Sequence, residues 1–166
     1  MADLTPFQTA GPFLSLGLRQ GVRADGREPA AGAIAVSGRL TDGGGAGVPD
    51  GVLEFWHPAF AEVSRALTSA DGSYRIVLDR PAPVEGPDGS VVVVPYLAIR
   101  ILGRGILTQY LTRMYFPGDP ANDSDPVLGL VPAARRATLI AARLGPDAYA
   151  FDVVLQGEHE TAFFDA

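Results

Sequence analysis

The chain has 166 residues, of which 20 are glycine and 14 are proline; 47% are hydrophobic and 19% are charged. Glycine and proline at this frequency leave little room for long helices, which excludes a helix bundle. The formal net charge of −6, with no basic cluster, argues against nucleic acid as a partner. No apolar run approaches the roughly 20 residues of a membrane span, so we expect no membrane partner. All 13 basic residues are arginine and cysteine is absent, which excludes disulfides, thiolate metal sites and Schiff-base chemistry.

The chain begins with an extended, proline-containing arm, which we predict over residues 1–17. A polar, glycine-rich loop follows over residues 21–32. The opening residues lack the basic and apolar segments of an export signal, which predicts a cytoplasmic protein. No internal repeat or linker divides the chain, so we expect residues 1–166 to form one domain.

Short runs of β-branched or alternating residues, bounded by turn residues such as Asp-Gly, predict the strands. These runs are residues 33–41, 52–56, 73–79, 91–102, 106–116 and 149–156. One helix is predicted over residues 132–143, because proline stands at its start and Gly145 follows its end. The expected fold is all-β: a two-sheet β-sandwich with one short accessory helix and an extended N-terminal arm.

The two histidines, His57 and His159, have no spacing that would place them together on one face. We therefore expect both to be solvent-exposed or to cap backbone groups. Asp119, Asp123 and Asp125 lie in a run that lacks the closing glutamate and the glycine of an EF-hand loop. That run predicts a polar, turn-rich loop and no calcium site.

Arg113 is the first candidate for binding, because the predicted strand places it on one face with Leu107, Leu111 and Tyr115. A guanidinium on a partly apolar face requires an anion nearby. Two alternatives stay open: an internal ion pair, for example with Asp119, or bidentate capture of a ligand carboxylate.

The arm residues Thr9, Gly11 and Pro12 also have two interpretations. They form a loose tail, or they form a stiff segment that reaches into a partner, where Gly11 permits close approach beside a rigid proline.

Several segments together resemble the intradiol ring-cleavage dioxygenases, nearly end to end and in the right order. They are TPFQTAGPF in the arm, LEFW at 53–56, DGSYRI at 71–76, LTRMYFPGDP at 111–120, RRATLIA at 135–141 and YAFDVVLQGEHETAFFD at 149–165. The resemblance implies a β-sandwich in a family that uses non-haem Fe(III), held by two tyrosines and two histidines. These enzymes open a catechol ring between its hydroxyls with O₂.

The positions at which the resemblance places the iron ligands hold other residues. Ser64 stands eight residues after Trp56, where an iron-binding chain has its first tyrosine. Tyr96 and Ala98 occupy the two histidine positions, and the loop at 81–87 lacks the second tyrosine. The chain is therefore similar to the metal-free chain of two-chain members, in which a homologous iron-binding beta subunit holds the Fe(III). A stand-alone iron dioxygenase would require four ligands that this sequence does not supply.

In those two-chain members, which act on protocatechuate with O₂, the metal-free chain supplies part of the partner's substrate cleft. The resemblance implies that Thr9, Gly11 and Pro12 line this cleft and that Arg113 lies near the substrate carboxylate. The expected partners are the homologous beta subunit, protocatechuate and O₂. The alternative is a non-catalytic β-sandwich that binds a small ligand or has a structural role, for which Arg113 and the arm would be dispensable to ring cleavage.

Overall fold

The structure is a computed structural model that describes residues 9, 11, 13, 32–59 and 63–165. The predicted arm therefore falls largely outside the described residues, and Pro12 is among those not described.

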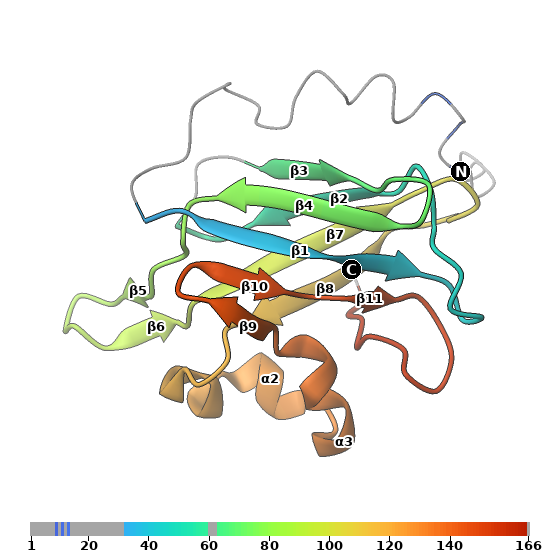
Figure 1. Cartoon of the computed structure of the whole chain (residues 1–166). Coiled ribbons are helices and arrows are strands. Elements are labelled where there is room, and N and C mark those ends of the chain that lie inside the picture. The colour runs from blue at the N-terminus through green and yellow to red at the C-terminus, as the bar shows by residue number, and fades with distance from the viewer. Residues whose placement is uncertain (1–8, 10, 12, 14–31, 60–62, 166) are drawn as a thin grey trace, which may run out of the picture.

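Two sheets packed face to face form the body of the molecule (Figure 1). The first is antiparallel, in the order β3 (Ser64–Leu67), β2 (Val52–Trp56), β7 (Tyr96–Leu102) and β8 (Tyr110–Tyr115). The second contains β4 (Ser73–Leu78), β1 (Ile34–Thr41), β10 (Ala148–Ala150), β9 (Ala142–Gly145) and β11 (Val153–Val154). In it β1 pairs antiparallel with β4 and parallel with β10 and β11. A small hairpin of β5 (Val84–Glu85) and β6 (Val91–Val93) projects to one side. The predicted β-sandwich is confirmed.

The core lies between the two sheets because their strands alternate apolar and polar residues. In β4, for example, Tyr74 and Ile76 are buried whereas Arg75 and Val77 are exposed. The Tyr74 hydroxyl donates a hydrogen bond to the Phe151 carbonyl oxygen at 2.5 Å, which ties β4 to the segment between β10 and β11.

Short helices cover one end of the sandwich, below the sheets in Figure 1. They are η1 (Pro120–Ser124), α2 (Pro126–Leu130), α3 (Ala133–Arg136) and η2 (Ala137–Leu139). Asp119 caps η1 through the Ala121 N–H at 3.0 Å, and Asp125 caps α2 through the Leu128 N–H at 2.7 Å. The expected polar loop at 119–125 is therefore partly helical, and two of its aspartates are caps.

The helix predicted over 132–143 is much shorter in the structure. Its α-helical part ends at Arg136, and the chain enters β9 at Ala142. The reason is tertiary pairing: the Ala141 N–H donates to the Tyr115 carbonyl at 3.0 Å, and β9 pairs with β10. These long-range bonds override the local helical preference of the alanine-rich segment.

Three predicted strands also differ from the structure. The run 91–102 is divided into β6 and β7 around Pro95, which has no N–H to donate. The run 106–116 pairs only from Tyr110, and the run 149–156 is divided between β10 and β11. The strands β3, β5 and β9 were not predicted, because they are short and lack a clear alternation.

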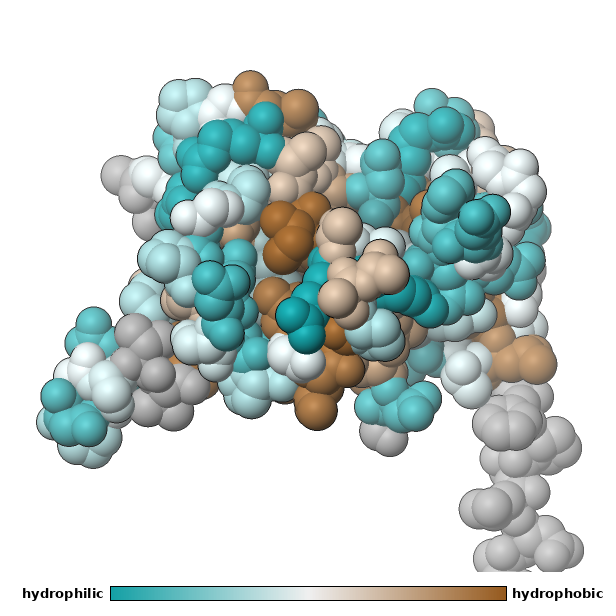
Figure 2. Space-filling model, turned by 90° about the horizontal axis from the view of Figure 1, so that it is seen from below, coloured by the Kyte–Doolittle hydropathy of each residue, from teal (hydrophilic) through white to brown (hydrophobic). Residues whose placement is uncertain are grey.

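The face that carries the short helices is mixed in polarity. Figure 2 shows it from below, with brown hydrophobic residues interspersed among teal hydrophilic ones. Leu130 at the end of α2 is 84% exposed. Within residues 32–59 and 63–165, no helix has the length and apolar character to cross a membrane.

Substitution of Gly38 in β1 tests how closely this strand packs against Phe151. A Cβ atom built at Gly38 would lie 1.9 Å from the Phe151 carbonyl oxygen. We expect Gly38→Ala to lower the free energy of unfolding by about 3 kcal/mol and the Tm by about 6–12 °C, because the backbone must move apart. Thermal unfolding of the purified chain measures this.

Gly129→Ala is the matched control, because a Cβ at Gly129 in α2 meets no described atom within 4 Å. We expect this variant to keep or raise the Tm, since alanine is the better helix former. Equal stability of the two variants would contradict the close approach of β1 to Phe151.

Candidate functional site

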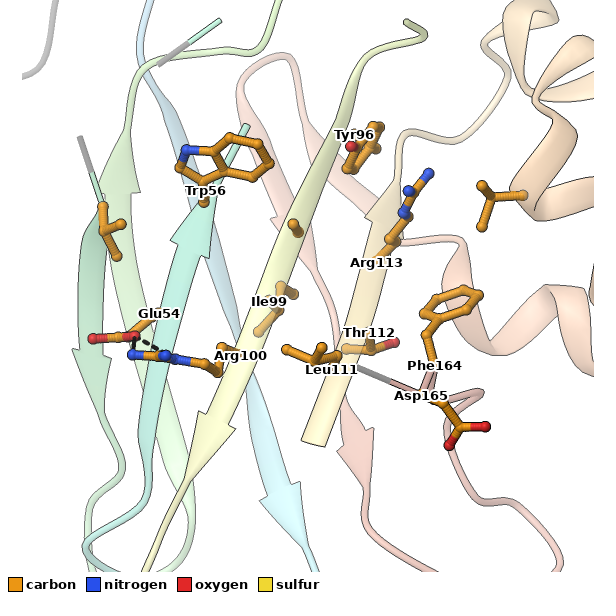
Figure 3. Close-up of a pocket in the computed structure, with 13 residues that line it drawn as sticks. Glu54, Trp56, Tyr96, Ile99, Arg100, Leu111, Thr112, Arg113, Phe164 and Asp165 are labelled. Carbon is orange, nitrogen blue, oxygen red and sulfur yellow. Dashed lines mark hydrogen bonds and ion pairs between the residues drawn. The ribbon is translucent and has the colours of Figure 1, made fainter. Parts of the chain in front are cut away.

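A cavity of about 610 Å³ opens on the face of the first sheet that points away from the core (Figure 3). Its walls come from three neighbouring strands, helix α2 and the C-terminal segment. The residues that shape it are Trp56 of β2, Tyr96 and Ala98 of β7, Arg113 of β8, Val127 of α2 and Phe164.

Strand register explains why these side chains meet. Trp56 pairs with Ala98, and Ala98 pairs with Arg113, so the three residues form one row across β2, β7 and β8. Side chains in such a row lie on the same face of the sheet. Because Ala98 carries only a methyl group, the middle of the row is hollow between Trp56 and Arg113. Phe164 reaches the cavity because its N–H donates to the Leu111 carbonyl at 2.8 Å.

Arg113 is held on several sides at the edge of this cavity. Its side chain is 24% exposed, and its Cζ atom lies 4.2 Å from the centre of the Tyr96 ring. Its Nη1 atom donates to the Tyr115 hydroxyl at 3.3 Å and lies 3.9 Å from Asp125 Oδ2. The expected anionic partner is thus Asp125 and not Asp119. Arg113 both forms an internal ion pair and lines a cavity.

Tyr115 links Arg113 to Asp125. It is fully buried, and its hydroxyl donates to Asp125 Oδ1 at 3.0 Å. Burial raises the pKa of Tyr115 well above its usual range, although the hydrogen bond and the charge of Arg113 act in the opposite direction. The phenol is therefore protonated at neutral pH, and its single proton is directed to the carboxylate.

A second arginine–carboxylate cluster lies at the other end of the cavity, where Figure 3 shows Glu54 beside Arg100. The buried Glu54 carboxylate accepts hydrogen bonds from Arg65 Nε at 2.5 Å and from Arg100 Nε at 2.7 Å. Burial acts to raise the pKa of Glu54, but the hydrogen bonds and charges of both arginines outweigh it and hold this pKa below its ordinary value. The cluster fixes the outer face of β3, β2 and β7.

The prediction that each histidine is exposed or caps a backbone group is confirmed: His57 is buried but caps a backbone N–H, and His159 is exposed. His57 has no exposed surface, because the Tyr96 ring packs edge-on against it with the ring centres 5.4 Å apart. Its Nδ1 atom accepts the Ala59 N–H at 3.0 Å. Burial lowers the pKa of His57, while a hydrogen bond with the Val94 backbone acts to raise it. His159 is exposed.

The donor set of this region does not fit an iron site of two tyrosines and two histidines. Ser64 and Ala98 offer no phenol or imidazole at two of the ligand positions. At a third, the Tyr96 ring lies between His57 and the guanidinium of Arg113. No group of three or more His, Cys, Asp or Glu side chains suited to a metal occurs in the described part of the chain.

The structure does not bring the arm and Arg113 together. The Thr9 hydroxyl accepts the N–H of Gly105 at 2.8 Å, in the turn that joins β7 to β8. Arg113 pairs with Ala98 farther along that hairpin. Thr9 and Gly11 are exposed, and neither is among the described residues that line the cavity.

Sequence reasoning missed three contributors to the site. Asp125 directly precedes Pro126, a pattern typical of a helix N-cap, but Asp119 precedes Pro120 in the same way. Trp56 ends its strand 41% exposed, which its hydrophobic run did not indicate. Phe164 had no local signal, since its place depends on the pairing of the C-terminal segment with β8.

No protein-family model matches the chain, but curated relatives do. It is 35% identical to protocatechuate 3,4-dioxygenase alpha chain of Burkholderia cepacia, over 97% of this chain and 96% of that protein. It is 34% identical to the alpha chain of Pseudomonas putida, with the same coverages. The beta chain of Burkholderia cepacia is 29% identical, over 81% of this chain and 68% of that one.

Solved structures agree in fold. The dioxygenase domain of a carbohydrate-binding fusion protein from Streptomyces sp. SirexAA-E has a TM-score of 0.57 at 21% identity, covering 96% of this chain and 100% of that one. Catechol 1,2-dioxygenase from Pseudomonas arvilla C-1 has a TM-score of 0.58 at 19% identity, covering 80% of this chain and 54% of that one. The chain belongs to the family of protocatechuate 3,4-dioxygenase alpha chains, within the intradiol dioxygenases.

Proposed function

We propose that this chain is the metal-free subunit of a protocatechuate 3,4-dioxygenase. The enzyme opens protocatechuate between its two hydroxyls with O₂ and gives 3-carboxy-cis,cis-muconate in the catabolism of aromatic compounds. The observation that carries the proposal is the combination of family membership with Ser64, Tyr96 and Ala98 at ligand positions, a donor set that does not fit iron.

The partner in this proposal is a homologous beta subunit that holds the Fe(III) and performs the redox chemistry. Its likeness to this chain is supported by the 29% identity to a beta chain. The metal-free chain then contributes to substrate binding and to the shape of the beta subunit's cleft.

Arg113 is the residue proposed to bind the substrate carboxylate. Its Nη1 atom is engaged by Tyr115 and Asp125, whereas Nε and Nη2 form no hydrogen bond with the described residues. These two nitrogens are the edge of the guanidinium that suits a bidentate carboxylate.

The arm residues Thr9, Gly11 and Pro12 are proposed to line the partner's cleft. Support comes from Thr9 and Gly11, which are exposed and lie outside this chain's own cavity. A Cβ at Gly11 would meet no described atom within 4 Å, so packing within the described part of this chain does not require glycine at this position.

The visible absorption spectrum tests the proposed division of labour. The full chain is purified alone, and it is also retrieved through a tag from its native host grown on protocatechuate. We expect a reddish tyrosinate-to-Fe(III) band only in the second preparation, together with a second subunit. Colour in the chain alone would mean that it holds iron, and a colourless single chain from the host would favour a non-catalytic binding module.

Arg113→Gln tests the carboxylate contact in the complex. We expect KM for protocatechuate to rise about 10- to 100-fold, because a charge-assisted bond is lost, while the iron content stays constant. Steady-state O₂ uptake and metal analysis measure both. Arg75→Gln, which removes the same charge from an exposed position on β4, should leave KM unchanged. Equal effects of the two variants would point to long-range charge and not to contact.

Gly11→Ala tests the arm. Because a Cβ at Gly11 meets no described atom within 4 Å, we expect the free energy of unfolding of the isolated chain to change by less than about 0.5 kcal/mol. In the complex the added methyl should lower kcat/KM for protocatechuate by about tenfold or more, because it enters a packed cleft. Wild-type kinetics in the complex would remove the arm from the cleft.

A further inference from the structure

We infer that Tyr115 and Asp125 are a positioning pair that orients Arg113 toward the substrate carboxylate without touching the substrate. The inference rests on the proposed role of Arg113 and adds what fixes that residue's geometry. The contacts that connect Asp125, Tyr115 and Arg113 are all between described side chains, and Figure 3 shows where Arg113 lies.

Arg113 needs such a restraint because a long, flexible side chain loses much rotamer freedom when it binds a ligand. Stacking on the Tyr96 ring, 4.2 Å from Cζ, restricts the plane of the guanidinium. Stacking alone does not decide which edge of the guanidinium faces the cavity. A hydrogen bond to one terminal nitrogen of the guanidinium determines which edge faces the cavity.

Tyr115 supplies that bond. It lies two residues after Arg113 in β8, so both side chains are on the same face of the strand. Its hydroxyl oxygen is 3.3 Å from Arg113 Nη1, and its proton goes to Asp125 Oδ1 at 3.0 Å. With its proton committed to the carboxylate, the oxygen presents a lone pair to Arg113, which sets the direction of the bond.

Asp125 anchors the arrangement to a different part of the fold. Its side chain is only 5% exposed, and Oδ1 also accepts the Leu128 N–H at 2.7 Å at the start of α2. Its Oδ2 atom lies 3.9 Å from Arg113 Nη1 and compensates the guanidinium charge. A buried carboxylate in this position requires such a partner. The N-cap of a helix and a sheet tyrosine thus hold one corner of Arg113, and the Nε and Nη2 edge is left for a carboxylate.

The test uses the reconstituted complex with Tyr115→Phe and Asp125→Asn. Two competitive inhibitors separate the carboxylate contact from the rest of the cleft: 4-hydroxybenzoate, and 4-hydroxybenzyl alcohol, which lacks the charge. We expect each variant to raise the inhibition constant of 4-hydroxybenzoate, and KM for protocatechuate, by about 5- to 10-fold. The inhibition constant of the alcohol, kcat and the iron absorption band should stay within about twofold of wild type.

Matched controls exist for both substitutions. Asp119→Asn changes the other aspartate cap, which bonds the Ala121 N–H. Tyr110→Phe removes a hydroxyl from the same strand, at a ring that packs on Phe163. Both controls should leave the ratio of the two inhibition constants at its wild-type value. In an Arg113→Gln background, Tyr115→Phe should have no further effect on that ratio, because the interaction it supports is already lost.

The outcomes separate the two proposals. If Arg113→Gln changes the ratio and Tyr115→Phe and Asp125→Asn do not, the positioning pair is refuted and the role of Arg113 stands. If Arg113→Gln leaves the ratio unchanged, both fail. Equal weakening of both inhibitors by Tyr115→Phe would show general loss of structure and overturn the inference. Should Asp125→Asn unfold the chain, Tyr115→Phe decides, since it removes one oxygen atom only.

Discussion

The antiparallel register of β2, β7 and β8 is the constraint on which the rest of the site depends. It fixes Trp56, Ala98 and Arg113 in one row, and the small residue in the middle determines that a hollow exists there. A shift of one residue in β8 would turn Arg113 into the core and Met114 out of it. The chemistry of the site is thus set by backbone pairing before any side-chain contact is considered.

Two buried carboxylates compensate the positive charges of the arginines on the outer face of this sheet. Glu54 binds two guanidiniums from neighbouring strands, whereas Asp125 compensates a single guanidinium and also caps a helix. All basic residues of the chain are arginine, and at each end of the cavity a planar guanidinium lies beside a carboxylate. The two clusters differ in arrangement: both oxygens of Glu54 bind arginines, whereas Asp125 divides its oxygens among Arg113, Tyr115 and a helix N–H.

The sequence predicted the sheet-forming runs well where alternation is strong, as in Val52–Trp56, whose bounds match those of β2. It failed where tertiary pairing decides, as in the alanine-rich segment that turns into β9. For the site, it identified Arg113 and the need for an anion, but Asp119 and Asp125 are equivalent by local pattern. Only the contacts of Asp125 with Tyr115 and Arg113 in the folded chain distinguish them. The burial of His57 was missed because it depends on Tyr96 from another strand.

The parallel pairing of β1 with β10 and β11 has a consequence for how the molecule folds. The Arg39 N–H donates to Asp152 Oδ1, across a separation of 113 residues, and β1 receives its second set of backbone partners from the last strands of the chain. During synthesis, β1 therefore has one edge unpaired until β10 and β11 have left the ribosome. Such long-range closure is slow, and an open strand edge invites pairing with other chains in the interval. The interval between the emergence of β1 and that of β11 is thus the period in which this edge is open to pairing with other chains.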